Sequence, residues 1–393
     1  DFVDVRIRMR HVIGGAEITV RLGTESVYDG YFVPGLLPYE LRLAVGAGTR
    51  ADATTELDLA DLDLTVEKPA ATRRPPLHVE VFNHVLTDNS KTAFEAEVDL
   101  PPAGWAFGRV ILTLEIHAAG KDWDEWDRCG HLYVVDEELG KLDIVPFITS
   151  YRTPCHWEVD VTHFLPWLTG KRTFEIAAGT TFYKNRGYMM SVSLDYYHGT
   201  PELEPYAITP LWVGTARYKS AENHFADFFT PQAVTLGAET RAARVFTTTT
   251  GHSQVGEFTP SKRALAFDGS EVRHRYEDVL WKTDCYLNPN RPQYGTWKYP
   301  RAGWAPGDVV RPWWVDLTPH VQPGQELVLH YEPEPYDFGG APNAPSEQEI
   351  AKANHIVRSY LIEYRDPGGL VPAPVLRVTG VQDGSNAAKA GMK

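Results

Sequence analysis

The turn DWDEWDR, Asp122 to Arg128, gathers chemically capable side chains between two strand-like runs, GRVILTLEIHAAG and HLYVVD. It carries four carboxylates, two indoles and one guanidinium. Burial beside indole rings raises the pKa of a carboxylate from about 4 towards neutrality, and the carboxylate can then take a proton from water. A solvated turn gains nothing from two tryptophans. The composition therefore indicates a ligand or reaction site, with Asp127 as the candidate base.

The same residue types also have structural uses. An isolated Asp–Arg pair usually stabilises a turn, so Asp127 and Arg128 alone do not establish catalysis. The neighbouring acids Asp122, Asp124 and Glu125 are expected either to be solvated or to pair with nearby basic residues. Further motifs must decide between the two readings.

Composition narrows the class of protein. A chain of 393 residues, 43% of them hydrophobic, predicts two to four domains, and 32 glycines and 29 prolines favour turns over long helices. The net charge of -14 argues against a nucleic-acid partner. No apolar run approaches the ~20 residues of a membrane span. The first residues, DFVDVRIRMR, resemble a strand rather than a signal segment, so we expect the chain to start inside a larger product.

Neither cysteine nor histidine spacing indicates a metal or a cofactor. The three cysteines, Cys129, Cys155 and Cys285, lack CxxC spacing and allow at most one disulfide. The 14 histidines form no HxH or HExxH pair. We therefore expect an enzyme or binding protein without a metal centre.

Apolar residues recur at every second position along most of the chain, as in VDVRIRMR, AEITVRLG, LHVEVFNHV, FEAEVDL and RVILTLEIH. This period is typical of strands with one buried face, and helical periodicity is nearly absent. One short helix is expected in SEQEIAKAN (346–354), where Ser346 and Glu349 have capping-box spacing. The pattern predicts an all-β fold of antiparallel sandwiches or jelly rolls.

A repeated stretch divides the body of the chain. WEVDVTHFLPWLTGKRTFEI and WWVDLTPHVQPGQELVLHYE share Val-Asp-(Val/Leu)-Thr, a short loop closed by glycine and an alternating strand. Asp160 and Asp316, each followed two positions later by threonine, are suited to capping a turn. The two copies predict two similar jelly-roll domains, at 77–205 and 206–366.

The flanks predict smaller pieces. KPAATRRPP (68–76) is a Pro-rich linker. Residues 1–67 resemble half of a concanavalin-like lectin sandwich, or form a small β-domain that covers the next one. Residues 367–393 are read as a linker followed by the truncated start of a PDZ-like domain, or by an ordinary strand–turn–helix tail.

Several ordered motifs resemble those of the peptide-N-glycosidase F family. DEWDR (124–128) resembles the family's active-site turn, and the motifs that follow the family's order and spacing are HVEVFNHV, PFITSYRTP, VDVTHF, LDYYHGTP, TGHS and PRAGWAPGD. The resemblance covers about residues 77–365. It implies two eight-stranded jelly rolls side by side, and an amidase that releases N-linked glycans without a cofactor.

The resemblance also implies roles for single residues. Asp127 matches the family's principal catalytic carboxylate, and Glu257 in HSQVGEF matches its second essential acid. The residues expected to contact substrate are Arg128, Arg301, Trp126, Trp304, His252 and Tyr151. Structural alternatives stay open for three of them. Arg301 could support its own loop, Trp304 could belong to the core, and His252 is expected as a hydrogen-bonded cleft residue rather than a base.

The sequence departs from the family pattern where the family carries a further glutamate and a tryptophan. Gly179 and Thr181 stand there instead, and Phe258 replaces the tryptophan after the second acid. Cys285 keeps one half of a family disulfide, whereas Ala305 has replaced the other half. These losses put sugar contacts, and with them activity, in question.

Three functions from different classes are compatible with these features. The first is a bacterial amidase, secreted, periplasmic or on the cell surface, that acts on N-glycosylated proteins or peptides and converts the linked asparagine to aspartate. The second is a non-catalytic glycan- or peptide-binding module with a degenerate cleft, motivated by Gly179 and Thr181. The third, a type II copper monooxygenase, shares paired jelly rolls but needs a histidine cluster that this sequence lacks. A monomer is favoured.

Overall fold

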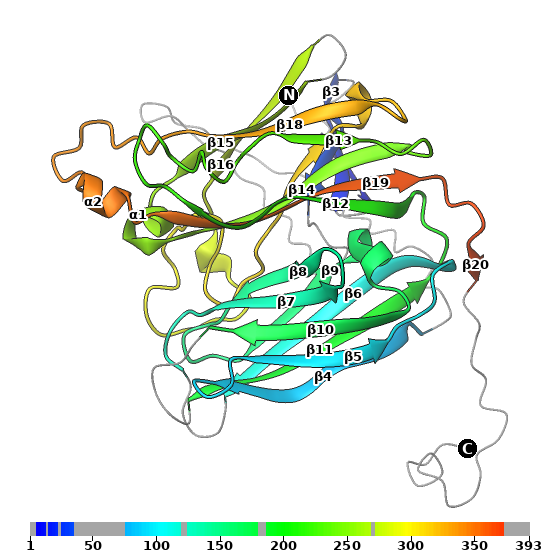
Figure 1. Ribbon diagram of the computed structural model, residues 1–393, viewed down its shortest axis with the longest axis horizontal. Coiled ribbons are helices and arrows are strands. Elements are labelled where there is room, and N and C mark those ends of the chain that lie inside the picture. Colours follow the sequence, from blue (N-terminus) through cyan, green and yellow to red (C-terminus); the bar gives the residue numbers. More distant parts are fainter. Residues whose placement is uncertain are drawn as a thin grey trace, which may run out of the picture.

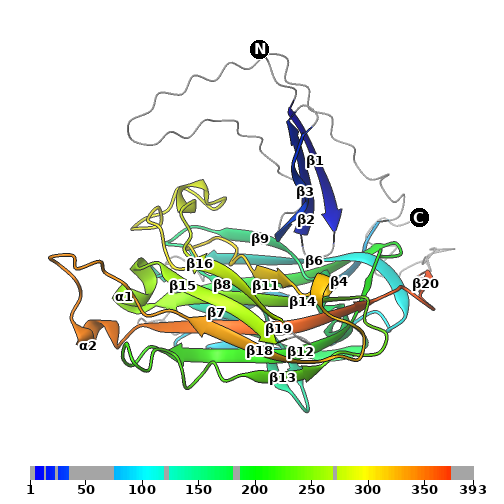
Figure 2. The same ribbon diagram turned by 90° about the horizontal axis from the view of Figure 1, so that it is seen from above.

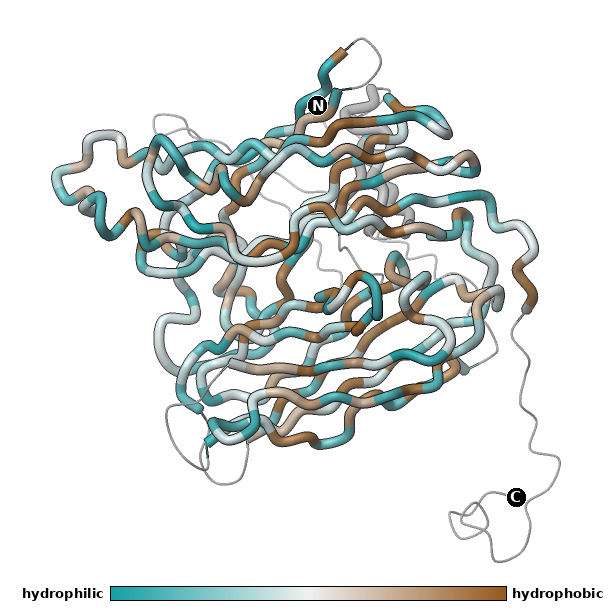
Figure 3. The backbone as a smooth tube through the Cα atoms, viewed as in Figure 1, coloured by the Kyte–Doolittle hydropathy of each residue, from teal (hydrophilic) through white to brown (hydrophobic). Residues whose placement is uncertain are grey.

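The computed structural model describes residues 5–12, 15–22, 25–34, 75–118, 124–179, 186–268 and 272–372. Their regular structure is dominated by antiparallel strands (Figure 1), which confirms the all-β fold class. Hydrophobic and hydrophilic residues alternate along many of these strands (Figure 3), because successive side chains point to opposite faces of a sheet. Within the described ranges, no helix has the length and apolarity needed to cross a membrane.

The first sandwich consists of two sheets, ordered β4-β11-β6-β9 and β5-β10-β7-β8. Its strands are β4 (Leu77–Asp88), β5 (Ala93–Asp99), β6 (Trp105–Ala118), β7 (Cys129–Asp136), β8 (Gly140–Ile148), β9 (Cys155–Asp160), β10 (Lys171–Ala178) and β11 (Gly187–His198). A 3-10 helix, η1 (Thr162–Trp167), joins β9 to β10. A two-residue strand, β20 (Val371–Pro372), lies parallel to the start of β6.

The second sandwich also has two sheets, ordered β12-β19-β14-β17 and β13-β18-β15-β16. Its strands are β12 (Glu204–Arg217), β13 (Gln232–Thr235), β14 (Ala242–His252), β15 (Ser261–Asp268), β16 (Arg273–Leu280), β17 (Trp313–Asp316), β18 (Glu326–Pro333) and β19 (Asn354–Arg365). The helices between them are α1 (Ser253–Phe258), η2 (Cys285–Leu287), η3 (Thr318–His320) and α2 (Glu347–Ile350).

Both sandwiches have the connectivity of a jelly roll. In each, the first strand pairs with the eighth, the second with the seventh, the third with the sixth and the fourth with the fifth. The predicted architecture of two jelly rolls is therefore confirmed. We keep the division into 77–205 and 206–366 as a proposal, noting that β4 begins at Leu77 and β12 at Glu204.

The sequence repeat has the same structural role in both jelly rolls. Asp160 accepts a hydrogen bond from the main-chain N–H of Thr162 at 3.0 Å, and Asp316 accepts one from that of Thr318 at 3.1 Å. Each threonine hydroxyl in turn accepts from a main-chain N–H of the neighbouring strand, β6 at 2.9 Å and β14 at 3.2 Å. The motif thus fixes the corner that follows the sixth strand of each roll.

Aromatic rings join the two sandwiches. Phe164 of η1 packs edge-on against Phe246 and Tyr360 of the second sandwich, with ring centroids 5.3 and 5.6 Å apart. The ring centroids of His163 and Trp314 lie 5.1 Å apart. Burial lowers the pKa of His163 to about 3, so its ring is neutral. All five side chains are buried. The contact is continuous with the core of the first sandwich, so the two rolls share one hydrophobic cluster.

A buried ion pair lies in the same interface. Arg358 of β19 donates through Nε to Oδ2 of Asp143 in β8, and Nδ1 of His131 lies 2.7 Å from that oxygen. The side chains of Arg358 and Asp143 are each 3% exposed. Burial opposes the ionisation of Asp143, but Arg358 and the hydrogen bond with His131 outweigh it and hold the pKa of Asp143 below its usual range.

The ends of the chain are described only in part. β1 (Val5–Val12), β2 (Gly15–Leu22) and β3 (Glu25–Pro34), drawn in dark blue in Figure 2, form a three-stranded antiparallel sheet, which confirms the strands predicted there. The rest of the lectin-like region, 35–67, and the PDZ-like tail, 373–393, lie outside the described residues. The predicted short helix is α2, with both hydrogen bonds of its capping box formed by Ser346 and Glu349.

Replacing Arg358 with methionine tests how much the ion pair in the interface contributes to the free energy of unfolding. The change leaves the carboxylate of Asp143 buried without its cation, so the free energy of unfolding should fall by about 3–5 kcal/mol in denaturant titrations. Arg241→Met is the control, because Arg241 is 59% exposed and pairs with an exposed Asp366; it should cost less than about 1 kcal/mol. Equal losses in the two variants would contradict this view of the interface.

Candidate functional site

The acidic turn is fixed by hydrogen bonds from within. Asp124 is buried; its carboxylate accepts from the main-chain N–H of Trp126 at 3.0 Å and pairs with Nε of Arg128 at 3.3 Å. The hydroxyl of Thr149 accepts from the N–H of Arg128 at 2.7 Å and lies 3.1 Å from the carbonyl oxygen of Trp126. This places Asp127 at a rigid position just before β7. Asp122 lies outside the described residues.

Within the described residues, the carboxylate of Asp127 has one side-chain hydrogen-bond partner, Tyr151. The Tyr151 hydroxyl donates to Oδ2 of Asp127 at 2.6 Å, and Tyr151 itself is only 9% exposed. Burial raises the pKa of Asp127 above its ordinary value, although the Tyr151 hydrogen bond and the charges of Arg301 and Arg128 oppose the shift. Such a carboxylate is a better proton acceptor than a solvated one.

The second acid, Glu257, lies on α1 directly after β14. Its Oε1 accepts from Nε of Arg301 at 2.7 Å, and its side chain is 20% exposed. Arg301 is completely buried and also donates to the carbonyl oxygens of Thr296 at 2.9 Å and Tyr299 at 3.1 Å. Arg301 therefore supports its own loop and holds Glu257. This favours the structural alternative for Arg301 over direct contact with substrate.

The two acids belong to one electrostatic environment. Burial raises the pKa of Glu257; Arg301 opposes the shift, and the negative charge of Asp127 adds to it. Arg301 also acts on Asp127. The charge of Asp127 in the first sandwich thus acts on Glu257 in the second, and the Arg301 guanidinium opposes the rise in pKa of both carboxylates.

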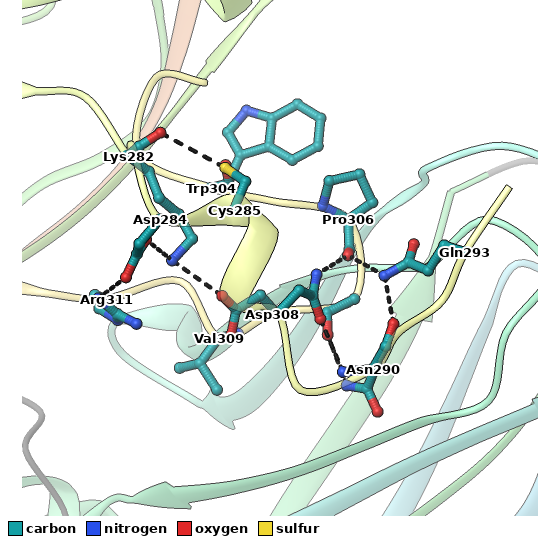
Figure 4. A network of polar contacts seen from close by, with 12 residues as sticks. Lys282, Asp284, Cys285, Asn290, Gln293, Trp304, Pro306, Asp308, Val309 and Arg311 are labelled. Atoms are coloured by element: carbon teal, nitrogen blue, oxygen red, sulfur yellow. Dashed lines mark hydrogen bonds and ion pairs between the residues drawn. The ribbon is translucent and has the colours of Figure 1, made fainter. Parts of the chain in front are cut away.

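A long loop of the second sandwich holds this environment together. We call residues 281–312, between β16 and β17, the clasp. Nζ of Lys282 lies 2.7 Å from Asp284 and 3.0 Å from Asp308, which ties the start of the clasp to its end (Figure 4). Arg311 pairs with Asp284 at 2.7 Å. Cys285, buried beneath this network, is a free thiol, as are Cys129 and Cys155.

The clasp also reaches the first sandwich. The main-chain N–H of Tyr151 donates to Oε1 of Gln293 at 3.0 Å, and that of Gly307 donates to the carbonyl of Ile148 at 2.8 Å. Within the clasp, Lys282 and Arg301 exchange two main-chain hydrogen bonds, at 2.7 and 3.2 Å. The clasp therefore positions both the tyrosine that binds Asp127 and the arginine that binds Glu257.

Trp304 is buried, and His252 is engaged in contacts with neighbouring side chains. Trp304 is 2% exposed and donates through Nε1 to the carbonyl of Gly251 at 2.8 Å, so it belongs to the core and offers no open face. His252 stacks on Trp304, bonds to the Thr250 hydroxyl at 2.7 Å, and has its pKa lowered by burial to about 4. It is neutral near pH 7. The Cys129 thiol lies 3.8 Å from the His252 ring, and burial raises its pKa to about 11, so it is a poor nucleophile.

Trp126 is the predicted aromatic residue that does face solvent, with 48% of it exposed. Arg128 is mostly covered, with 15% of its side chain exposed. Gly179 donates its N–H to the carbonyl of Cys129 at 3.0 Å, and a Cβ built on it would lie 3.4 Å from Cβ of Arg128. A side chain at position 179 would thus stand beside Arg128. Thr181 lies outside the described residues.

A separate cavity of about 360 Å³ lies between the sandwiches, lined by residues that include Trp105, Tyr206 and Arg365. None of the candidate residues lines it. Asn354 at one end of β19 pairs with His252, which directly precedes the helix that carries Glu257, and Arg365 ends the same strand, so the cavity lies at the opposite end of β19 from Glu257. In the part of the chain that is described, no group of three or more His, Cys, Asp or Glu side chains could hold a metal ion.

Sequence reasoning missed the residues that position the acids. Lys282 and Gln293 lie outside every motif, and they became visible only through contacts with distant parts of the chain. Asp308 stands in the motif PRAGWAPGD, which carried the only sequence signal for this network. Asp124, expected to be solvated or paired, is buried and pairs with Arg128.

Comparison with known proteins gives a consistent result. Residues 221–362 match the family described as peptide-N-glycosidase F, C terminal. Peptide-N(4)-(N-acetyl-beta-D-glucosaminyl)asparagine amidase F from Elizabethkingia miricola is 28% identical over 307 residues, which cover 71% of this chain and 84% of the relative.

Two solved structures share the fold. The crystal structure of a peptide-N(4)-(N-acetyl-beta-D-glucosaminyl)asparagine amidase matches with a TM-score of 0.63 and 22% identity over 74% of this chain and 96% of that one. That of PNGase F, a glycosylasparaginase from Flavobacterium meningosepticum, matches with a TM-score of 0.61 and 22% identity over 75% and 97%. The chain is therefore similar to peptide-N-glycosidase F in sequence and in fold, and its residues 221–362 match the model of that family's C-terminal domain.

Proposed function

We propose that this protein hydrolyses the amide bond between an asparagine side chain and the first N-acetylglucosamine of an N-linked glycan. The observation that carries the proposal is the pair of partly buried carboxylates, Asp127 and Glu257, each with a raised pKa and each bound by its own partner. The named activity of the relatives supplies the substrate class.

Asp127 would act as the general base. Its raised pKa suits it to take a proton from a water molecule, whose oxygen then attacks the carbonyl carbon of the asparagine side chain. The tetrahedral intermediate collapses as the carbon–nitrogen bond breaks, and the proton held by Asp127 passes to the departing nitrogen. The products are an aspartate residue and a glycan that ends in a glycosylamine.

The other residues would orient the substrate and stabilise charge. Glu257, fixed by Arg301, would orient the sugar or the attacking water. The guanidinium of Arg128, in the same turn as Asp127, would stabilise the oxyanion that forms on the carbonyl oxygen. Trp126 would offer its exposed indole to a sugar face. The substrate would be an N-glycosylated protein or peptide, encountered outside the bacterial cytoplasm.

A glycan-binding module without catalysis is the second candidate. It is favoured by the lack of a carboxylate at Gly179, next to Arg128, and by the burial of Arg301 and Trp304, which leaves fewer groups to contact a substrate. Retention of glycopeptides without release of their glycans would support this function and exclude the amidase.

Asp127→Asn should abolish most of the activity without unfolding the protein. Loss of the base should slow glycan release by about 10²- to 10⁴-fold, measured by mass spectrometry of a glycopeptide. Wild-type product should be about one dalton heavier than the asparagine peptide, because aspartate replaces asparagine. Glu137→Gln, which also replaces a carboxylate with an amide but at an exposed position, is the control. Full activity in Asp127→Asn would remove the assigned base.

Tyr151→Phe should move the acid limb of the pH–rate profile to higher pH. Asp127 works only when ionised, so activity is lost as the pH falls through its pKa. The Tyr151 hydrogen bond lowers that pKa, and its removal lets burial raise the pKa further. The measurement is kcat/KM against pH, with Tyr197→Phe, an exposed tyrosine, as the control. An unchanged limb would mean that another group limits the rate.

Lys282→Met should destabilise the clasp and thereby lower the activity of the site. It leaves Asp308, which is 6% exposed, without its cation, so we expect a loss of roughly 3 kcal/mol in the free energy of unfolding and a fall in kcat/KM. Arg311→Met changes a cation of the same network that is 61% exposed, and should cost less than about 1 kcal/mol. If both variants keep wild-type activity and stability, the clasp does not position the acids.

A further inference from the structure

The outer side of the clasp carries aromatic side chains that the fold leaves in solvent. Tyr294 is 68% exposed and Tyr299 is 60% exposed, and Trp126 beside Asp127 is 48% exposed. Exposed aromatic surface forgoes the free energy that burial would bring, and a group of such residues next to a reaction site usually contacts a ligand. Neither tyrosine has a part in the hydrolysis described above.

Main-chain contacts place both tyrosines next to the groups that hold the acids. The N–H of Tyr294 donates to the carbonyl of Tyr151 at 3.4 Å, and the Tyr151 hydroxyl binds Asp127. The carbonyl of Tyr299 accepts from Arg301, which binds Glu257. Each tyrosine is thus connected to an acid through one intervening residue, Tyr294 to Asp127 through Tyr151 and Tyr299 to Glu257 through Arg301.

The backbone between them fixes their outward position. Gly295 has φ +73° and a Cβ there would lie 3.4 Å from the Tyr151 ring, so this segment lies flat against Tyr151. The guanidinium carbon of Arg152 lies 6.0 Å from the Tyr294 ring centroid, and Arg152 is itself held by Glu125 at 2.5 Å. The Tyr294 ring is therefore held in place while most of its surface stays open.

The polar groups of the clasp are largely engaged with one another. Nδ2 of Asn290 donates to the carbonyl of Gly307 at 2.6 Å, and Nε2 of Gln293 donates to that of Pro306 at 2.8 Å (Figure 4). The N–H of Tyr299 donates to the carbonyl of Thr296 at 3.2 Å. A peptide that docked here as an added strand would need free main-chain partners. Sugar rings need only an aromatic face for their C–H groups and a hydroxyl at its edge, which a tyrosine supplies.

We propose that Tyr294 and Tyr299 bind sugar rings of the glycan, and so determine affinity for the carbohydrate part of the substrate. The proposal rests on the proposed function for the choice of ligand, since the same site would release that glycan. Among the described residues, the side chains bound to the acids are Tyr151 and Arg301 rather than these tyrosines, so the contribution of Tyr294 and Tyr299 is to binding. Their removal should raise KM and leave kcat nearly unchanged.

The test measures binding without turnover. Calorimetry measures the binding of N,N'-diacetylchitobiose to the full chain. A second titration uses an asparagine-containing peptide that carries no glycan. Tyr294→Ala and Tyr299→Ala should each weaken chitobiose binding by about 2- to 10-fold, and the double variant more than either. The corresponding phenylalanine variants keep the ring and should remain within about twofold of wild type. Tyr197→Ala, which removes an exposed tyrosine of the first sandwich, is the matched control.

Every outcome decides the proposal. Unchanged chitobiose binding in the double alanine variant, or no chitobiose binding by the wild type, overturns it. Loss of peptide binding alone assigns the tyrosines to the peptide and also overturns it. If the tyrosines prove necessary for sugar binding while wild-type protein releases no glycan, the tyrosine assignment stands and the amidase function fails. Melting curves that coincide with wild type exclude misfolding of the variants.

Discussion

One buried guanidinium, that of Arg301, connects the acid Glu257 to the clasp. It donates to Glu257 from one side and to the carbonyls of Thr296 and Tyr299 from the other, with no exposed surface of its own. A fully buried charge is costly unless it is paired and hydrogen-bonded. Displacing Glu257 or either carbonyl would therefore leave the guanidinium of Arg301 with one partner fewer. Because Arg301 also moderates the pKa of Asp127, its position links the acid of the first sandwich to that of the second.

The clasp explains how two separate jelly rolls produce one site. Each roll is complete by its own strand order, and the shared aromatic cluster fixes their relative position. The buried residues of that cluster include none from the clasp and none from the turn that carries Asp127. The clasp is held by the ion pair at its base, between Lys282 and Asp308, and by its bond from Gln293 to the Tyr151 main chain. Charged contacts thus surround Cys285, the half of a family disulfide whose other half is replaced here by Ala305.

Local sequence signals predicted the strands, the repeat and the turn, because each depends on neighbours along the chain. Alternation located β4, β5 and β6, and the Val-Asp-x-Thr repeat located equivalent corners in both rolls. Contacts between distant residues leave no such signal. The ion pair of Asp143 with Arg358 spans 215 positions, and nothing near Trp304 or Arg301 shows that both are buried. The turn around Asp127 was therefore predictable, and the arrangement that supports it was not.

The central claim is that Asp127 and Glu257 share one desolvated environment across the two sandwiches. NMR titration of the Glu257 side-chain carboxyl, in wild type and in Asp127→Asn, tests it directly. The wild-type pKa should lie above the ordinary glutamate value of 4.5 and should fall when the negative charge at position 127 is removed, because that charge contributes to the shift. A Glu257 pKa that is ordinary in wild type, or identical in the two proteins, would contradict the account.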